Sequence, residues 1–308
     1  MTKAWKAHAG LLCTNLIFGT NYSIVQYIAA RGVQPFGLNV IRVGVSTVLL
    51  WLLIFFIPHK PGIRKEHFGR MLLCALTGIV INQLLFIKGL TLTLSMHASL
   101  LMLITPVFVT ITAAWLIKEP LNVYKILGLA IGISGAVMLV LLKENTNNHG
   151  AKNILLGNVL IVINAVSYAF YFVLVKPLME AYHPFHVIRW IFTLGLIFVL
   201  PIGWSEFSAI PWQSFATVDY AALTFIVIFA TFLAYLFNLY GISKLGASVA
   251  GAYIYTQPFF ASIIAIFILG ESLSLYKIIA ATLIMGGVLL VSQKSKVTSQ
   301  NKEAQLPS

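Results

Sequence analysis

Charged residues are scarce in this chain, and acidic residues are the scarcest. Only 9% of the 308 residues are charged, with 8 Asp and Glu against 20 Lys and Arg, whereas 59% are hydrophobic and the mean hydropathy is +0.93. A soluble domain needs more polar surface than this, so a soluble fold is excluded. The net charge of +12 does not indicate nucleic-acid binding, because Lys and Arg lie between long apolar segments and do not cluster on one face.

Cysteine is also rare, and no sequence motif indicates a catalytic or metal site. Cys13 and Cys74 both fall inside apolar segments, so we interpret them as packing side chains and not as a disulfide or redox pair. The chain has no zinc-protease motif, nucleophile elbow or phosphate-binding loop. Neither a metal nor a cofactor is therefore predicted.

Long apolar segments make up most of the chain. A helix needs about 20 mostly apolar residues to cross a hydrocarbon core of about 30 Å. The segments are continuous and lack the alternation of barrel strands, so we predict membrane helices. Ten segments meet the requirement, at 7–30, 35–57, 68–88, 95–117, 124–142, 154–176, 184–204, 220–241, 248–269 and 275–293.

The distribution of Lys and Arg predicts the orientation of these spans. Cytoplasmic loops retain positive charge, and with the N-terminus inside, 14 of the 20 Lys and Arg fall on the cytoplasmic side. We therefore predict a multi-pass protein of the cytoplasmic membrane. Both termini are expected to be cytoplasmic, as an even number of spans requires.

The two halves of the chain repeat each other at an offset of 152 residues. The segment from Glu119 to Ile126 aligns with the segment from Glu271 to Ile278, with five of eight residues identical. The same register makes further pairs, namely Gly89 with Gly241, Ala98 with Ala250, Pro106 with Pro258, Phe108 with Phe260, and Gly135 with Gly287.

Each half contains five predicted spans, and this odd number inserts the second half upside down relative to the first. Inverted repeats are typical of secondary transporters, which bind substrate near the bilayer midplane between the halves. We predict an all-α membrane protein with ten transmembrane helices in two inverted five-helix repeats. Its parts are a first repeat at 7–142, a connector at 143–153, a second repeat at 154–293 and a polar cytoplasmic tail at 294–308.

In each half, an apolar helix that contains proline ends in a Glu-x-Leu block, and the next helix carries a late Gly. This pattern resembles the drug/metabolite transporter superfamily, in its EamA-type branch with two repeats, over about residues 7 to 293. The resemblance implies export or exchange of small metabolites such as amino acids, without a bound cofactor. One departure is Lys118 before Glu119, where family members often carry Gly, as in Gly270 before Glu271. The sequence therefore makes no prediction of a tight turn at the end of the fourth span.

Two prolines lie near the middle of the fourth and ninth spans. Pro106 and Pro258 come about ten residues into their helices, or about 15 Å at 1.5 Å per residue. Each removes a backbone hydrogen bond and deprives the carbonyl of Met102 or Ile254 of its helical partner. Broken helices often mark transport sites, although proline also makes simple packing kinks in membrane helices. Because the two are repeat equivalents, we predict hinges that line a cavity.

Polar side chains occur in five spans, and in four of them they recur at helical spacing. In the sixth span, for example, Asn164, Tyr168 and Tyr171 share one face. Such residues can be hydrogen-bonded glue between helices, but five helices that present amide and phenol groups favour a central cavity. The predicted substrate-binding residues are Asn15, Asn21, Tyr22, Asn82, Gln83, Asn164, Tyr168, Tyr171, Tyr235, Asn238, Tyr253 and Gln257.

All eight acidic residues fall at the ends of predicted spans or in loops. A buried carboxylate is the usual proton or sodium relay and the usual counter-ion for a cationic drug, so multidrug cation efflux is disfavoured. Basic side chains do approach the interior, at Arg42, Arg189, Lys88 and His97. We predict that these four gate the pathway or attract an anion, with snorkelling to the interface as the alternative.

The sequence thus predicts a secondary transporter, an exporter or exchanger of small metabolites, whose partners are a small-molecule substrate and the bilayer and not nucleic acid. Gly128 and Gly132 are typical of close helix packing, including a homodimer contact. The alternatives are an intramembrane enzyme and a non-transporting receptor or structural protein. Ser134 with His97 could form a protease-like pair, but Ser134 aligns with Gly286, as at a packing position. A receptor would not explain the inverted duplication.

Overall fold

The computed structural model describes residues 2–53, 63–118, 121–141, 153–245 and 253–292. Within these ranges, helices form ten spans, because a backbone in lipid must satisfy its own hydrogen bonds. The first repeat contains α1 (Thr2–Ala30), α2 (Pro35–Leu52), α3 (Lys65–Ala75) continued by η2 (Leu76–Val80) and α4 (Ile81–Leu90), α5 (Ser95–Met102) followed by α6 (Thr105–Leu116), and α7 (Val123–Leu141). The second contains α8 (Ile154–Ala181), α9 (Pro184–Ser208), a short η3 (Trp212–Ser214), α10 (Thr217–Thr224) continued by η4 (Phe225–Leu233) and α11 (Ala234–Leu245), η5 (Ile254–Thr256) followed by α13 (Gln257–Leu269), and α14 (Leu275–Ser292).

The predicted all-α membrane fold is confirmed. Seven of the described helical segments are long and apolar enough to cross a membrane, and Ile254–Leu269 and Leu275–Leu290 are apolar but shorter. Several boundaries differ from the prediction. The helix α8 continues five residues past its predicted end, through Pro177, because helices extend beyond the hydrocarbon core. The predicted span residues 54–57, 142, 248–252 and 293, most of the connector and the tail lie outside the described residues.

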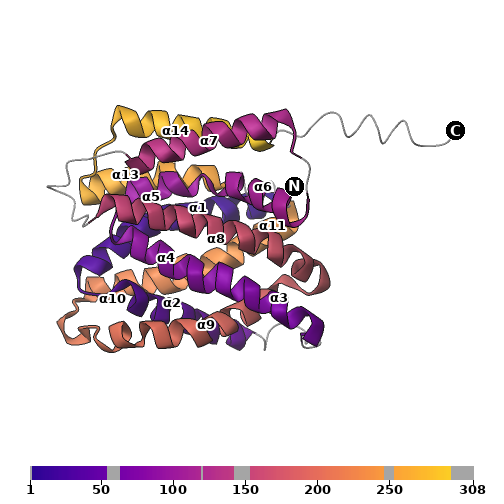
Figure 1. The fold of residues 1–308 in the computed structure, drawn as a ribbon. Coiled ribbons are helices and arrows are strands. Elements are labelled where there is room, and N and C mark those ends of the chain that lie inside the picture. Colours follow the sequence, from indigo (N-terminus) through magenta and orange to yellow (C-terminus); the bar gives the residue numbers. More distant parts are fainter. Residues whose placement is uncertain (1, 54–62, 119–120, 142–152, 246–252, 293–308) are drawn as a thin grey trace.

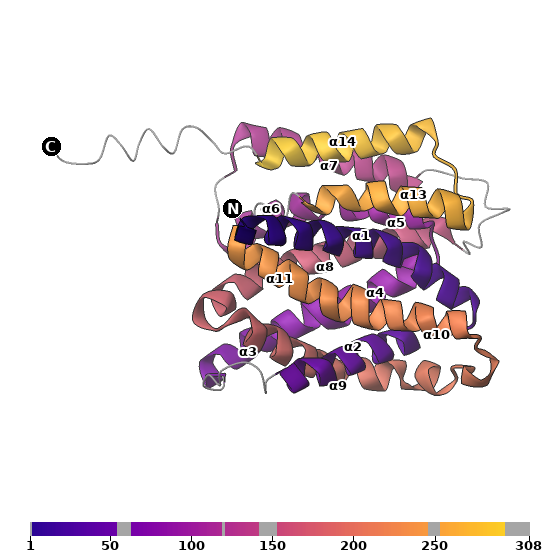
Figure 2. The ribbon, with the colours of Figure 1, turned by 180° about the vertical axis from the view of Figure 1, so that it is seen from behind.

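The spans lie side by side, and repeat-equivalent helices form both edges of the bundle (Figures 1 and 2). One edge is α7 with α14, and the opposite edge is α2 with α9, in both views. The helices α1, α4, α8, α11 and α13 lie between these edges. Because five spans precede α8, this helix starts at the end of the bundle opposite the start of α1.

Small residues bring α7 and α14 into backbone contact. A Cβ atom added to Gly287 would overlap the backbone nitrogen of Gly132 and would lie 2.6 Å from the carbonyl oxygen of Gly128. The close packing predicted for Gly128 and Gly132 is therefore made within the chain. The prediction of a homodimer contact at this pair is wrong, because the chain's own α14 occupies that face.

Irregular helical turns occur at equivalent places in the two repeats. The π-helical η2 aligns, at the offset of 152, with residues inside the π-helical η4. The fourth span breaks between Met102 and Thr105, and the ninth span passes through the 3₁₀ turn η5 before α13. Such interruptions are frequent at functional sites of helical proteins.

The broken helices begin again at the two prolines. Pro106 and Pro258 stand in the first turn of α6 and α13, where a missing N–H costs nothing. The two carbonyls that lose their usual helical donor find others. The Thr105 hydroxyl donates to the carbonyl oxygen of Met102 at 2.7 Å, and the backbone N–H of Gln257 donates to that of Ile254.

The fourth and ninth spans each have a residue in the left-handed backbone conformation just after the helix. Lys118 has a φ of +53°, close to the +69° of its repeat equivalent Gly270. The positive φ is thus kept where Lys replaces the glycine, although a side chain disfavours this left-handed conformation.

Candidate substrate-binding site

A cavity of about 120 Å³ lies between the two repeats. Its walls come from α1, α2, α4, α5, α6, α8, α11 and the η5–α13 break. The π-helical turns directly precede its lining residues on α4 and α11, and the two proline breaks place Thr105 and Gln257 in its wall. The irregular turns of both repeats therefore surround one site.

Hydrogen bonds across this region join one repeat to the other. Gln257 Nε2 donates to Asn15 Oδ1 at 2.9 Å, and Asn164 Nδ2 donates to the carbonyl oxygen of Asn82 at 2.6 Å. Gln83 Nε2 lies 3.4 Å from the Tyr235 hydroxyl, a long contact. Each pair has one member in each repeat, so movement of the repeats relative to each other would change these contacts.

Arg42 supplies the positive charge of the cavity. The side chain is 5% exposed, and its Nε donates to Thr231 Oγ1 at 3.1 Å. Nη1 is buried and has no hydrogen-bond partner, and among the described residues no carboxylate lies within 4.0 Å of the guanidinium. Of the described residues that line the cavity, Arg42 alone carries a charge. The site is therefore electropositive and polar.

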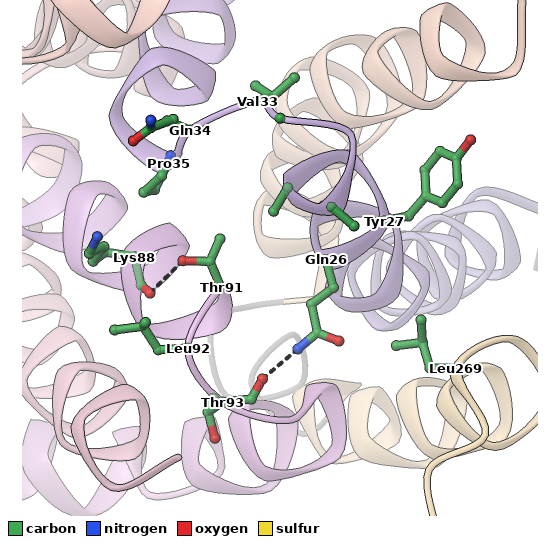
Figure 3. A pocket seen from close by; sticks show the side chains of 13 residues that line it. Gln26, Tyr27, Val33, Gln34, Pro35, Lys88, Thr91, Leu92, Thr93 and Leu269 are labelled. Atoms are coloured by element: carbon green, nitrogen blue, oxygen red, sulfur yellow. Dashed lines mark hydrogen bonds between the residues drawn. The ribbon is translucent and has the colours of Figure 1, made fainter. Parts of the chain in front are cut away.

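A larger hollow of about 720 Å³, which we call the vestibule, lies where α1 ends and α2 begins. Figure 3 shows Gln26 of α1 reaching across to the loop after α4, with Lys88 on the far wall. Gln26 Nε2 donates to the carbonyl oxygens of Leu90 at 3.0 Å and Thr93 at 2.6 Å, and its Oε1 accepts from Ser95 Oγ at 2.7 Å. Gln26 thus ties α1 to the α4–α5 connection.

An aromatic pair lies between the vestibule and the cavity. Tyr22 is one helical turn before Gln26 on α1, and it meets Phe86 of α4 edge to face with ring centroids 5.5 Å apart. Both rings line the cavity, whereas Gln26 and Lys88, further along the same helices, line the vestibule. The two hollows therefore follow one another along α1 and α4.

Ten of the twelve predicted substrate-binding residues line the cavity. Tyr171 and Tyr253 do not line the cavity. Tyr171 stacks on Tyr168, with ring centroids 5.8 Å apart. The hydroxyl oxygen of Tyr253 lies 2.8 Å from Nδ1 of His8. The ten that do line it are Asn15, Asn21, Tyr22, Asn82, Gln83, Asn164, Tyr168, Tyr235, Asn238 and Gln257.

The four basic residues lie in different parts of the structure. Arg42 lines the cavity and Lys88 the vestibule, but Arg189 and His97 line neither. The Arg189 guanidinium lies over the Trp51 ring, 4.4 Å from its centroid, on the α2–α9 edge. His97 is fully buried, with Nδ1 3.1 Å from Asn158 Nδ2. Arg42 and Arg189 thus face different neighbours, and the gating role predicted for the four basic residues stays a prediction.

The sequence analysis missed several apolar and hydroxyl residues of the cavity wall. Two of these residues could have been predicted from their positions in the sequence. Phe18 follows Asn15 by three residues on the same helical face, and Thr105 precedes the hinge residue Pro106. The missed lining residues are Thr14, Phe18, Phe86, Met102, Thr105 and Ile254.

The Glu-x-Leu block of the second repeat has a structural role beside the vestibule. Glu271 is 3% exposed, and its two oxygens accept from the backbone N–H groups of Ser95 at 2.8 Å and Met96 at 3.0 Å, at the start of α5. Burial raises the pKa of this carboxyl above its usual range, against the opposing effect of the two backbone donors. The acidic residue caps a helix and does not enter the cavity.

Neither a metal centre nor a serine nucleophile is formed by the described residues. Within the ranges that the structure covers, no three His, Cys, Asp or Glu side chains are grouped to hold a metal ion. Ser134 is exposed on α7 and donates to the carbonyl oxygen of Ile131 in its own helix at 2.8 Å, whereas His97 is buried.

Inverted five-helix repeats around a polar cavity define a secondary transporter that spans the bilayer and carries a small molecule. The sequence profile of the EamA-like transporter family matches residues 5–141 and 155–293, so the chain belongs to this family. It is a transporter and not an enzyme.

Similar proteins agree with this assignment. An uncharacterized transporter of Archaeoglobus fulgidus is 26% identical over 94% of this chain and 98% of its own length, and the uncharacterized transporter YetK of Bacillus subtilis is 23% identical over 96% and 89%. A probable terminal-alkyne amino-acid exporter of Streptantibioticus cattleyicolor is 24% identical over 99% of both chains. A solved structure, titled only as the crystal structure of a protein, shares the fold with a TM-score of 0.62 at 15% identity over 99% of both chains.

Proposed function

We propose that this transporter exports or exchanges small amino acids across the cytoplasmic membrane, with the 120 Å³ cavity as its substrate site. The observation that carries the proposal is the chemistry of that cavity. Amide and phenol groups from both repeats surround it, with the Arg42 guanidinium and, among the described lining residues, no carboxylate. An amino acid offers a carboxylate to the guanidinium, and its ammonium can donate to amide and phenol oxygens.

A lone organic cation fits this environment poorly. A cation that leaves water needs an opposite charge to offset its desolvation, and the described cavity wall instead presents a positive charge. The relative from Streptantibioticus cattleyicolor, named as a probable amino-acid exporter, supports the same substrate class and the outward direction.

Alternating access follows from the repeat-to-repeat contacts. Rocking of one repeat against the other would break the Asn15–Gln257 and Asn82–Asn164 hydrogen bonds and open the cavity at one end. With both termini in the cytoplasm, as the charge distribution indicates, the vestibule faces outward. Pro106 and Pro258, at the two helix breaks, are the proposed hinges, and Lys88 at the vestibule wall is the proposed first contact for a carboxylate.

Transport is tested first with the metabolites themselves. Cells with and without the expressed protein are compared by metabolite profiles of cells and medium, and purified protein in liposomes is then tested for uptake of labelled amino acids, organic anions and a quaternary ammonium compound. We expect amino acids to accumulate in the medium and to enter the liposomes. Robust transport of the quaternary cation alone would defeat the proposal.

The site is tested separately with cysteine substitutions. Tyr168→Cys and Gln257→Cys, in a chain whose native cysteines have been replaced, should react with a small membrane-impermeant thiol reagent and be protected by the transported amino acid. Tyr253→Cys is the matched control, because Tyr253 is on the same span as Gln257 and does not line the cavity. Equal protection of all three positions, or of none in an active protein, would show that the cavity is not the site.

A further inference from the structure

We propose that Arg42 binds the carboxylate of the transported amino acid and that the amide oxygens of Asn164 and Gln83 bind its ammonium group. This assignment rests on the proposed function and adds which atoms recognise the substrate. It makes Arg42 the residue that determines specificity for a carboxylate.

The guanidinium of Arg42 is prepared for a ligand oxygen. Its Nε is already held by Thr231 on η4, which orients the planar group, while the buried Nη1 has no hydrogen-bond partner. A buried charge without a counter-ion is unfavourable, and no described carboxylate is close enough to neutralise it. A substrate carboxylate supplies both the missing charge and the missing acceptor, in a geometry that suits arginine.

Two amide oxygens in the wall of the cavity have no hydrogen-bond donor. Asn164 Oδ1 and Gln83 Oε1 are buried and accept no hydrogen bond, although both residues line the cavity. The orientation of the Asn164 amide is set by its Nδ2, which donates to the carbonyl oxygen of Asn82 and therefore leaves Oδ1 as the free acceptor. An ammonium group carries three donors and no acceptor, so it matches these oxygens.

The combination selects a zwitterion over either ion alone. An amine without a carboxylate leaves Nη1 unpaired and adds a second positive charge. A carboxylic acid without an ammonium leaves the amide oxygens unpaired. Sites built to hydrogen-bond a substrate group discriminate strongly against analogues that lack it, because their buried polar atoms then remain unpaired.

The small cavity favours a small side chain. Its space of about 120 Å³ is only several times the roughly 10 to 15 Å³ that a cavity needs to hold one water. This favours alanine, threonine, valine and leucine over tryptophan. Phe18, Phe86 and Met102 supply apolar wall against which a small aliphatic side chain can pack.

The experiment uses the full-length protein in liposomes and needs no variant in its first arm. Uptake of labelled L-valine is measured against unlabelled L-valine, isobutylamine, which lacks the carboxylate, and isovalerate, which lacks the ammonium. L-alanine with ethylamine and propionate forms a second set. We expect each analogue to inhibit at least about tenfold more weakly than its amino acid. Equal inhibition by the amine and the amino acid would overturn the role of Arg42.

The second arm uses Arg42→Gln and Arg42→Lys, with Arg189→Gln as the matched control, since Arg189 is also a buried arginine but lies outside the cavity. We expect Arg42→Gln to weaken L-valine binding at least about tenfold. In this variant, unlabelled L-valine and isobutylamine should inhibit uptake with similar strength. Arg189→Gln should keep the wild-type preference. An unchanged preference in folded Arg42→Gln would refute the assignment while leaving amino-acid transport intact. A folded wild-type protein that takes up neither amino acid would instead remove the proposed function and this assignment with it.

Discussion

Gln26 is expected to act as a latch that keeps the vestibule closed off from the cavity. Its side chain makes three hydrogen bonds, two to the carbonyls of Leu90 and Thr93 and one from the hydroxyl of Ser95. Directly behind it along α1 and α4, Tyr22 meets Phe86. Opening the vestibule into the cavity requires α1 to move away from the α4–α5 connection, and this movement breaks all three bonds.

The substitution Gln26→Leu keeps a similar volume and removes the three hydrogen bonds. A hydrogen bond contributes a net of about 0.5 to 1.5 kcal/mol, so we expect the closed arrangement to lose about 2 to 4 kcal/mol with all three bonds. A loss of about 3 kcal/mol raises the ratio of open to closed protein roughly a hundredfold.

A cysteine in the cavity reports this change. Asn238→Cys is made in a chain in which Cys13 and Cys74 are replaced, and the rate of reaction with a membrane-impermeant thiol reagent is measured from the vestibule side. If opening limits the reaction, Gln26→Leu should accelerate it by up to the same roughly hundredfold factor. The control is Gln34→Leu, an identical substitution in the same vestibule at a side chain for which the structure records no hydrogen bond. Equal rates for the two variants would refute the latch.

Four further predictions concern stability and topology. Gly287→Ala should lower the free energy of unfolding in detergent by about 1 to 3 kcal/mol, because its Cβ meets the backbone of α7, whereas the neighbouring Gly286→Ala meets nothing within 4 Å and should be near neutral. Lys118→Gly should raise the free energy of unfolding by about 1 kcal/mol, since glycine adopts the positive φ without strain. A decrease in the free energy of unfolding would contradict this. Burial raises the pKa of Glu271 above 4.5, so the folded state holds the proton more tightly than the unfolded state. The free energy of unfolding should therefore fall as the pH rises from about 4.5 through the raised pKa. Glu271→Gln should remove this part of the pH dependence in thermal unfolding. Topology reporters fused between α7 and α8 should read external and one at the C-terminus cytoplasmic, and a cytoplasmic reading between the helices would contradict the predicted orientation.

The helix breaks at the two prolines illustrate how local rules lead to tertiary contacts. Proline at equivalent positions predicted two interruptions, and the structure has both. The sequence did not predict that the Thr105 hydroxyl would donate to the carbonyl freed in the first repeat, or that the π-helical turns η2 and η4 would form within the third and eighth spans. A π-helical turn has no sequence signature of its own, because it follows from how the flanking helices pack.

Hydropathy and the internal repeat alone determined the membrane class, the number of spans and the inversion of the halves, because a backbone in lipid has few alternatives to a helix and an odd repeat must invert. Polar residues within apolar spans, most of them at helical spacing, also identified ten of the residues around the cavity, since a polar face on a membrane helix has to meet protein or water. Only the tertiary structure separated Arg42 in the cavity from Arg189 over Trp51, and Tyr168 from Tyr253. Periodicity defines which side chains share a face of one helix, but the neighbour that this face meets depends on how ten helices pack together.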